Sequence, residues 1–246
     1  MMTDGESVTT LVPGRLTICT YGGFAPVCYA SETGHLLGLD VSFLTRFAAT
    51  LGLTLATIEQ PFDGLWTRPG ANVCDVAGAG IMRRDDRRVE PGGAWSGPYF
   101  YVQRSLLVRS AEQAEFDTPA TLAGKVIVVT RGSTAEIDAR TRYPNCTIQT
   151  VDMVAEGQAN PQEHIVRTLL AHRQVDAFAE GDLCNRYLRD AYGEDVAGGL
   201  ALADCHRLDG PPETFNFVVR AASLGVLDRL NDFIASSQGS YAPGSS

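Results

Sequence analysis

Residues 80–88, GIMRRDDRR, gather four arginines and two aspartates directly behind an apolar segment. A guanidinium carries a planar fork of donors that binds a carboxylate through two parallel hydrogen bonds, so an arginine here could clamp an anion. A solvated helix start would use the same residues, with Asp85 and Asp86 at the positive end of the helix dipole and the arginines paired outside. This stretch alone leaves both interpretations open.

A second anion site is indicated by RGST, residues 131–134. Ser133 and Glu136 have the spacing of a capping box, which satisfies N–H groups at the start of a helix. The hydroxyl of Thr134 and the remaining N–H groups of that first turn could bind a carboxylate. Capping and anion binding are compatible, so we expect both.

Other reactive side chains give weaker signals. Glu180, Asp182 and Cys184 lie close together and could support acid–base chemistry if they face a cleft. Lys125 is the single lysine and therefore the one Schiff-base candidate. The six cysteines show no CxxC spacing and the four histidines are dispersed, so we expect no metal site and no cofactor. An even cysteine number permits disulfides, and buried free thiols are the alternative.

The composition limits the partners. The 246 residues carry a formal net charge of −9, which argues against nucleic acid because that partner requires a basic face. No basic amphipathic helix indicates a membrane surface, and no apolar run approaches the ~18–20 residues of a membrane span. The start, MMTDGESVTT, lacks the basic and apolar regions of a signal peptide, so a signal was either removed or never present. A small-molecule partner is expected.

The elements that must position these residues alternate between β and α along the chain. LTICTY, residues 16–21, is typical of a buried strand, and residues 38–52 have apolar side chains at helical spacing ended by Gly52. The same order returns at KVIVVT, residues 125–130, and at the helix predicted over residues 132–142. This alternation favours mostly parallel sheets, and its repetition favours two lobes.

Six segments occur in one order at consistent separations: GRLTICT, the FAP loop, GHLLGLDVSFLTRFAATLGL, CDVAGAGIMRRDDRR with WSGPYF, AGKVIVVTRGSTAE, and RQVDAFAEGD. Together they resemble the type II periplasmic solute-binding proteins, in particular the branch that binds amino acids for ABC transporters. The resemblance implies an α/β fold of two lobes, each a mostly parallel sheet flanked by helices. Two crossover strands would form the hinge, and the ligand would lie in the cleft between the lobes.

The resemblance also implies domain boundaries. The first lobe would comprise residues 14–102 and return over residues 206–236, and the second lobe would comprise residues 103–205. Residues 1–13 and 237–246 would be flexible ends.

Carrying the family's Thr-x-x-Arg pattern onto this sequence places its carboxylate-binding arginine at Arg87 and puts Arg84 at the usual threonine. An inward Arg84 would favour a ligand more negative than a simple amino acid. The alternative is that Arg84 pairs with Asp85 or Asp86 in solvent.

The remaining ligand contacts are also implied by the resemblance. Phe24 and Phe62 would form aromatic walls on the ligand side chain, and Thr134 would complete the carboxylate grip. Gly80 and Met82 would line the strand end whose backbone carbonyls receive the ammonium group.

The aspartate that usually binds this ammonium falls on Gly181. Glu180 before it or Asp182 after it could substitute at a different angle, and a ligand other than an unmodified amino acid is the alternative.

Three functions follow. The leading one is a monomeric binding protein that closes on an amino-acid-like or carboxylate ligand and delivers it to an ABC permease or a sensor. It would act in the periplasm or at the cell surface if a signal peptide was removed. The second is an enzyme on the same fold, resembling cyclohexadienyl (prephenate or arogenate) dehydratase, with Glu180, Asp182 and Cys184 as catalytic candidates. The third is a cytoplasmic sensing or biosynthetic protein.

Overall fold

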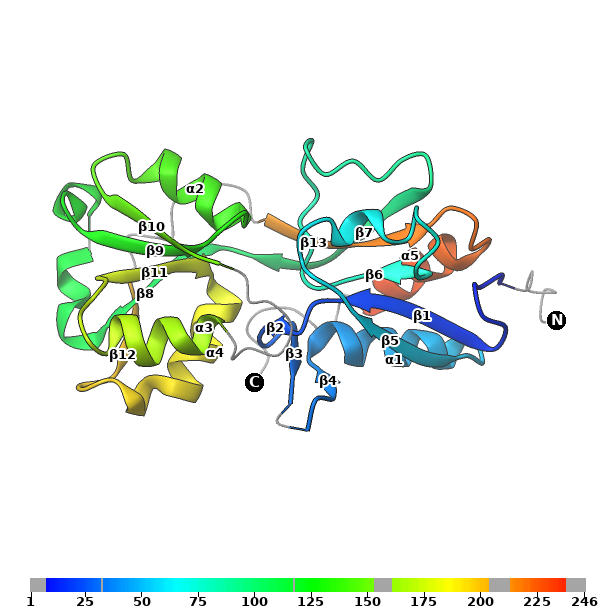
Figure 1. Cartoon of the computed structure of the whole chain (residues 1–246), viewed down its shortest axis with the longest axis horizontal. Helices are drawn as coiled ribbons and strands as arrows, with labels where there is room; N and C mark the ends of the chain where they lie inside the picture. Colours follow the sequence, from blue (N-terminus) through cyan, green and yellow to red (C-terminus); the bar gives the residue numbers. More distant parts are fainter. Residues whose placement is uncertain (1–7, 32, 117, 153–160, 204–212, 238–246) are drawn as a thin grey trace. The chain divides into compact units, whose positions relative to one another are not determined.

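The computed structural model describes residues 8–31, 33–116, 118–152, 161–203 and 213–237. The chain forms two compact units. Unit 1 comprises Met1–Gly22, Val27–Tyr101 and Thr214–Ser246, and unit 2 comprises Gly23–Pro26 and Val102–Glu213. Strand β7 (Gly93–Val102) ends at the first residue of the long segment of unit 2, and strand β13 (Glu213–Arg220) begins at its last (Figure 1).

The sheet of unit 1 has the strand order β5-β1-β6-β13-β7. Strand β1 runs parallel to β5 and to β6, whereas β13 is antiparallel to β6. Besides β7 and β13, the strands of this sheet are β1 (Arg15–Thr20), β5 (Thr54–Glu59) and β6 (Val76–Ala77). The other elements of unit 1 are β3 (Cys28–Ala30), β4 (Leu36–Leu37), α1 (Leu39–Thr50), a 3-10 helix (Leu65–Thr67) and α5 (Val226–Ser237).

Helix α1 shows why this part of the sequence folds as it does. Its apolar residues recur at helical spacing, and Phe43 and Phe47 are buried toward the sheet and α5. The Phe43 ring contacts Phe217 of β13 at 5.7 Å and Phe233 of α5 at 5.0 Å between centroids. Gly52, with φ 69°, takes the left-handed conformation that ends the helix. The core of unit 1 is therefore aromatic.

The sheet of unit 2 has the order β10-β9-β11-β8-β12. Strand β9 is parallel to β10 and β11, and β8 is antiparallel to β11 and β12, so this sheet is also mixed. The elements of unit 2 are β2 (Gly23–Phe24), β8 (Arg104–Arg109), 3-10 helices (Ser110–Phe116, Pro119–Leu122 and Gly193–Asp195), β9 (Val126–Thr130), α2 (Thr134–Arg142), β10 (Thr147–Val151), α3 (Pro161–His164) with a π-helical continuation (Ile165–Leu170), β11 (Ala177–Gly181), α4 (Asp182–Tyr192) and β12 (Leu200–Ala203).

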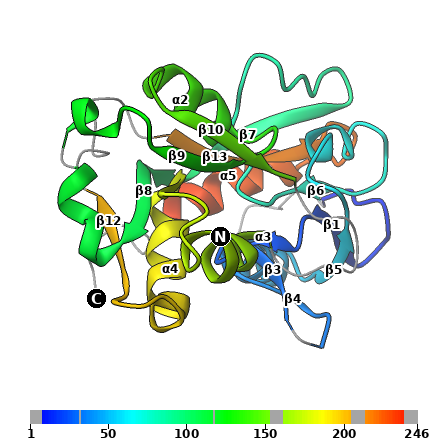
Figure 2. The same cartoon turned by 60° about the vertical axis from the view of Figure 1, so that its left-hand side comes forward.

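Alternate residues of the central strands build two cores, one on each face of this sheet. Leu107, Val128 and Phe178 pack on the face covered by α3 and α4. Their neighbours Leu106 and Ile127 pack on the face covered by α2. Figure 2 shows α2 on one side of the sheet and α3 with α4 on the other. Both faces are covered, so consecutive residues in the middle of β8 and β9 are apolar.

The predicted α/β fold is confirmed, with antiparallel strands added to each parallel group. Strand β6 is short. It comprises Val76–Ala77, and the chain that follows contains Gly78, packed against Phe217, and Gly80 with φ 63°.

The chain ends differ in part from the prediction. Thr9 and Leu11, placed by the sequence in a flexible end, donate backbone hydrogen bonds to the Leu224 carbonyl (3.0 Å) and to Asp75 (2.8 Å). Residues 1–7, 206–212 and 238–246 of the predicted boundaries lie outside the described residues. The lobe boundaries themselves stay predictions.

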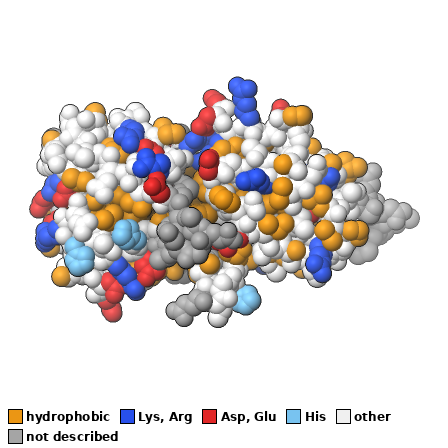
Figure 3. Space-filling model, in the orientation of Figure 1, with side chains coloured by type: hydrophobic (Ala, Val, Ile, Leu, Met, Phe, Trp, Pro, Cys, Tyr) orange, Lys and Arg blue, Asp and Glu red, His pale blue; other side chains and the backbone are white. Residues whose placement is uncertain are grey.

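No helix in the described ranges is long and apolar enough to cross a membrane. On the face drawn in Figure 3, basic and acidic side chains are interspersed rather than gathered by sign. This face therefore offers no extended basic surface.

Candidate functional site

Arg87 of unit 1 is buried, with 2% of its surface exposed. Its Nη1 donates to the Met82 carbonyl at 3.0 Å, and its own backbone N–H closes a turn to the Arg84 carbonyl at 3.0 Å. The guanidinium therefore turns back to the Met82 carbonyl, in the segment that follows β6. A buried guanidinium held in one orientation is suited to binding a carboxylate.

Two aromatic rings flank this guanidinium. The Arg87 Cζ atom lies 5.3 Å from the Phe62 ring centroid and 4.8 Å from that of Trp66. Phe62 also meets Trp66 edge-on at 6.4 Å and Tyr21 at 5.8 Å. The sequence prediction named Phe62 and missed Trp66; Phe62 precedes the 3-10 helix Leu65–Thr67 that carries Trp66, so helical spacing could not have paired the two rings.

Gly80 and Met82 lie in the segment leading to Arg87, as predicted, but their backbone groups are engaged. The Gly80 N–H donates to Asp40 Oδ2 at 3.0 Å. Met82, 7% exposed, forms a single β-bridge with Phe215. Its carbonyl, which was expected to receive an ammonium group, accepts from Arg87.

Arg84 adopts the arrangement that the sequence left as the alternative. Its Nε donates to Asp86 Oδ1 at 2.8 Å and its Nη2 to Oδ2 at 2.5 Å. These hydrogen bonds lower the pKa of the Asp86 carboxyl. The Asp86 side chain is 62% exposed and that of Arg84 is 18% exposed, so the carboxylate of this bidentate pair faces solvent while the arginine is largely covered.

The N-terminus of α2 confirms the capping box with one change. Ser133 Oγ accepts from the Glu136 N–H at 3.1 Å, and Glu136 Oε2 accepts from the Gly132 N–H at 2.8 Å, one residue earlier than in the usual box. Thr134, the predicted anion-binding residue, is the first residue of the helix and is half-buried.

Glu180 takes part in a buried ion group at the end of β11. It is 6% exposed, and its Oε1 accepts from Arg104 at 3.1 Å and from the Gly181 N–H at 2.8 Å. Arg104 also pairs with Glu213. Burial raises the pKa of Glu180, and the positive charge of Arg104 opposes that rise. Two carboxylates around one guanidinium leave this group a net charge of −1 when all three are ionised.

Asp182 and Cys184 have structural partners. Asp182 Oδ1 accepts from the Gln103 N–H at 3.0 Å, and Oδ2 pairs with Arg186 at 3.2 Å. Cys184 is 1% exposed and accepts from Gln162 Nε2 at 2.9 Å. Burial raises the pKa of the Cys184 thiol well above its ordinary value. Glu180, Asp182 and Cys184, two carboxylic acids and one thiol, do not form an exposed acid–base group.

The other candidates are also placed. Phe24 is half-buried against the core of unit 2. Lys125 pairs with Glu115 and packs over the Phe116 ring at 5.2 Å. Among the described residues, no three metal-ligating side chains gather. The described cysteines are free thiols, and Cys205 lies outside the described part.

The sequence matches the bacterial extracellular solute-binding proteins, family 3, over residues 16–241. It is 24% identical over 188 residues to a probable histidine-binding protein of Campylobacter jejuni, covering 76% of this chain and 67% of that protein. It is also 24% identical over 139 residues to the L-cystine-binding protein TcyJ of Escherichia coli, covering 56% and 52%.

Solved structures show the same fold. An amino acid ABC transporter substrate-binding protein from Streptococcus pneumoniae, bound to L-arginine, gives a TM-score of 0.74 at 21% identity and covers 92% of this chain and 89% of that chain. An ancestral amino acid-binding protein described as a precursor of cyclohexadienyl dehydratase gives 0.73 at 18% identity and covers 92% and 90%.

Proposed function

Because the chain belongs to family 3 of the bacterial extracellular solute-binding proteins, we propose that it binds a free amino acid through the α-carboxylate and presents it to an ABC-type membrane transporter. The observation that carries the proposal is the buried guanidinium of Arg87, which Met82, Phe62 and Trp66 hold in one orientation. Preorganised donors of this kind bind a carboxylate without a further ordering cost.

The charges favour a zwitterion over a dianion. In the segment after β6, Arg84 pairs with Asp86, Arg83 and Arg88 are exposed, and Arg87 is the buried arginine. In unit 2, Arg104 is matched by two carboxylates, Glu180 and Glu213. This distribution supports an ordinary amino acid and speaks against a keto-diacid such as prephenate.

A thermal-shift screen of L-amino acids, L-cystine, dicarboxylates and prephenate tests the ligand class. A ligand at a hundred times its Kd should stabilise the protein by ~2.7 kcal/mol. Stabilisation by dicarboxylates or prephenate alone would reject the amino-acid proposal.

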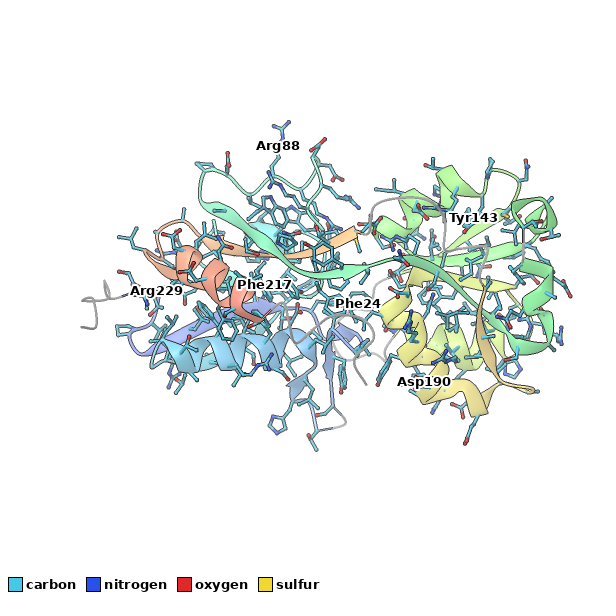
Figure 4. The ribbon with its side chains drawn as sticks, turned by 180° about the vertical axis from the view of Figure 1, so that it is seen from behind. Phe24, Arg88, Tyr143, Asp190, Phe217 and Arg229 are labelled. Atoms are coloured by element: carbon cyan, nitrogen blue, oxygen red, sulfur yellow. The ribbon has the colours of Figure 1, made fainter. Side chains whose placement is uncertain are left out.

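Calorimetry on Arg87→Ala tests the proposed contact between Arg87 and the ligand carboxylate. Loss of a desolvated charge contact should cost about 2–5 kcal/mol of binding, roughly thirtyfold or more in affinity. Arg88→Ala is the matched control, because Arg88 is exposed and projects away from the ribbon in Figure 4. Equal affinities in Arg87→Ala and Arg88→Ala would overturn the role of Arg87.

Location and assembly complete the proposal. The family is extracellular, which supports a periplasmic or cell-surface location, with an ABC permease as partner and a monomer as the working form. Fractionation of cells expressing the chromosomal gene and light scattering of the purified protein test these points. A cytoplasmic pool or a stable dimer would contradict them.

A further inference from the structure

A buried carboxylate, Asp40, holds the segment that carries the proposed ligand contacts of unit 1. Asp40 lies in the first turn of α1 and is 1% exposed. Its Oδ2 accepts from the Gly80 N–H at 3.0 Å, and its Oδ1 accepts from the Tyr99 hydroxyl of β7 at 2.6 Å. Two residues beyond Gly80, the Met82 carbonyl orients Arg87. One side chain therefore connects α1, β7 and the segment that leads to Arg87.

The surroundings leave this carboxylate little freedom. The Tyr99 ring stacks on Phe217 with centroids 3.9 Å apart, and Phe217 lies among the packed side chains of unit 1 (Figure 4). A Cβ added to Gly78 would lie 2.7 Å from the Phe217 ring and 3.3 Å from Asp40 Oδ2. A small cavity beside the carboxylate is lined by Val27, Leu39, Asp40, Phe43, Tyr99, Phe100 and Phe215. Apart from Asp40 and the Tyr99 hydroxyl, this lining is apolar.

We infer that Asp40 is a positioning residue of the ligand site. Its ionised carboxylate holds Gly80, and its protonation loosens the segment that carries Met82 and Arg87, which weakens ligand binding. This inference rests on the proposed function. An ionised carboxylate accepts on both oxygens, whereas a carboxylic acid uses one oxygen as a donor. Protonation therefore weakens or removes one of the two hydrogen bonds, and a bond from Gly80 to a charged acceptor is the stronger kind.

The charge on Asp40 changes near neutrality. Burial raises the pKa of Asp40 to about 7, and hydrogen bonds from Tyr99 and Gly80 lower it only in part. The other titratable groups that face it in the described part of the chain are Tyr99 and Cys28 of β3. Burial raises the pKa of Cys28 to about 12 and that of Tyr99 well above its ordinary value, so both stay neutral at this pH.

The test measures ligand affinity and the Gly80 amide over the same pH range. If only the ionised form binds, the Kd for L-arginine or L-glutamine should fall about tenfold from pH 6 to pH 8, because the competent fraction rises by about that factor. The NMR resonance of the Gly80 N–H in the ligand-free protein should titrate with the same midpoint.

Three variants separate positioning from folding. Asp40→Asn should abolish both pH dependences while the chain stays folded by circular dichroism. Tyr99→Phe should move both midpoints to higher pH, because the Tyr99 hydrogen bond lowers the pKa of Asp40. Asp228→Asn, an exposed carboxylate in the first turn of α5, is the control and should leave both midpoints unchanged.

The outcomes distinguish the two proposals. A Gly80 resonance that titrates while the Kd stays constant would overturn the positioning role, as would a resonance that does not titrate. If neither probe binds at any pH, the amino-acid proposal fails for these ligands. A Gly80 resonance that titrates would then show that Asp40 holds this segment, and the positioning role in binding L-arginine or L-glutamine would be rejected.

Discussion

Four arginines lie within six residues, and their surroundings separate them. Arg87 is 2% exposed between two aromatic rings, whereas Arg83 and Arg88 are exposed. Arg84 pairs with Asp86, and its side chain is 18% exposed. The four arginines therefore lie in different environments, and burial decides how strongly each charge acts.

We expect Arg84→Ala to change little. An ion pair with a largely exposed partner contributes ~1 kcal/mol or less, and the amino-acid proposal gives Arg84 no ligand contact. Urea unfolding and calorimetry on Arg84→Ala, Asp86→Ala and the double variant measure the pair. A tenfold loss of ligand affinity in Arg84→Ala alone would return Arg84 to the site and favour a more negative ligand.

Gly181→Asp should discriminate between ligand classes. Gly181 precedes α4 with extended dihedral angles, φ −64° and ψ 146°, and a Cβ there would lie 3.6 Å from the Val102 Cβ, an ordinary contact. Aspartate favours this N-cap position, so the variant should fold. It should bind amino acids more tightly and dicarboxylates less tightly than Gly181→Asn, which has the same shape without the charge. Calorimetry on both variants decides, and tighter dicarboxylate binding would contradict the zwitterion assignment.

Part of the site could be predicted from residue types and order. The capping-box spacing identified the cap of α2, because that motif depends on short-range spacing. Arg87 came from the family resemblance, and its binding role stays a prediction. The Arg104–Glu180–Glu213 group could not be predicted: the pairing of β8 with β11 brings Arg104 and Glu180 together, and Glu213 is the first residue of β13, 109 residues after Arg104.

At the scale of elements, helices and interior strands with strong patterns were predicted within a few residues. Helix α1, strand β9 and helix α2 agree with their predicted ranges. Strands β8 and β12 were not predicted, because their burial is set by partners distant in sequence and a short apolar run has no period of its own. Helix α3 changes to a π-helical turn at Ile165, for which we have no physical account.

The cap of α2 yields a prediction at this scale. Ser133→Ala removes the acceptor of the Glu136 N–H, which should lower the free energy of unfolding by ~1 kcal/mol. Ser236→Ala is the control, since that exposed hydroxyl only donates to the Phe233 carbonyl in the last turns of α5. Denaturant unfolding of both variants provides the comparison. Equal free energies would show that the cap contributes nothing.

At the scale of the whole molecule, two buried aspartates of unit 1 differ in the number of hydrogen bonds that their carboxylates accept. Asp75 is 0% exposed and accepts four hydrogen bonds, from the Thr17 N–H and hydroxyl, the Leu11 N–H and the Ser223 hydroxyl. It ties the start of the chain to β1 and to the loop before α5. The Asp40 carboxylate accepts from two donors, the Gly80 backbone N–H and the Tyr99 hydroxyl, so its charge is less well compensated for burial.

This difference makes the stability of the folded chain depend on Asp40 and pH. The folded pKa of about 7 exceeds the ordinary value of 3.8, so between these pH values the folded state holds a proton that the unfolded state releases. The contribution to the free energy of unfolding is therefore fully present below about pH 4 and is lost as the pH rises to about 7, by on the order of 4 kcal/mol at most.

Asp40→Asn should remove this pH dependence of the free energy of unfolding. Denaturant unfolding of the wild type and the variant at pH 5, 6, 7 and 8 isolates the contribution, because all other titrating groups cancel in the difference. The variant should gain stability relative to the wild type as the pH rises, while its ligand affinity stays independent of pH. Parallel stability curves would show that Asp40 is not protonated in the folded protein. The ionised carboxylate would then hold Gly80 at every pH in this range, and any change in ligand affinity would have to arise elsewhere.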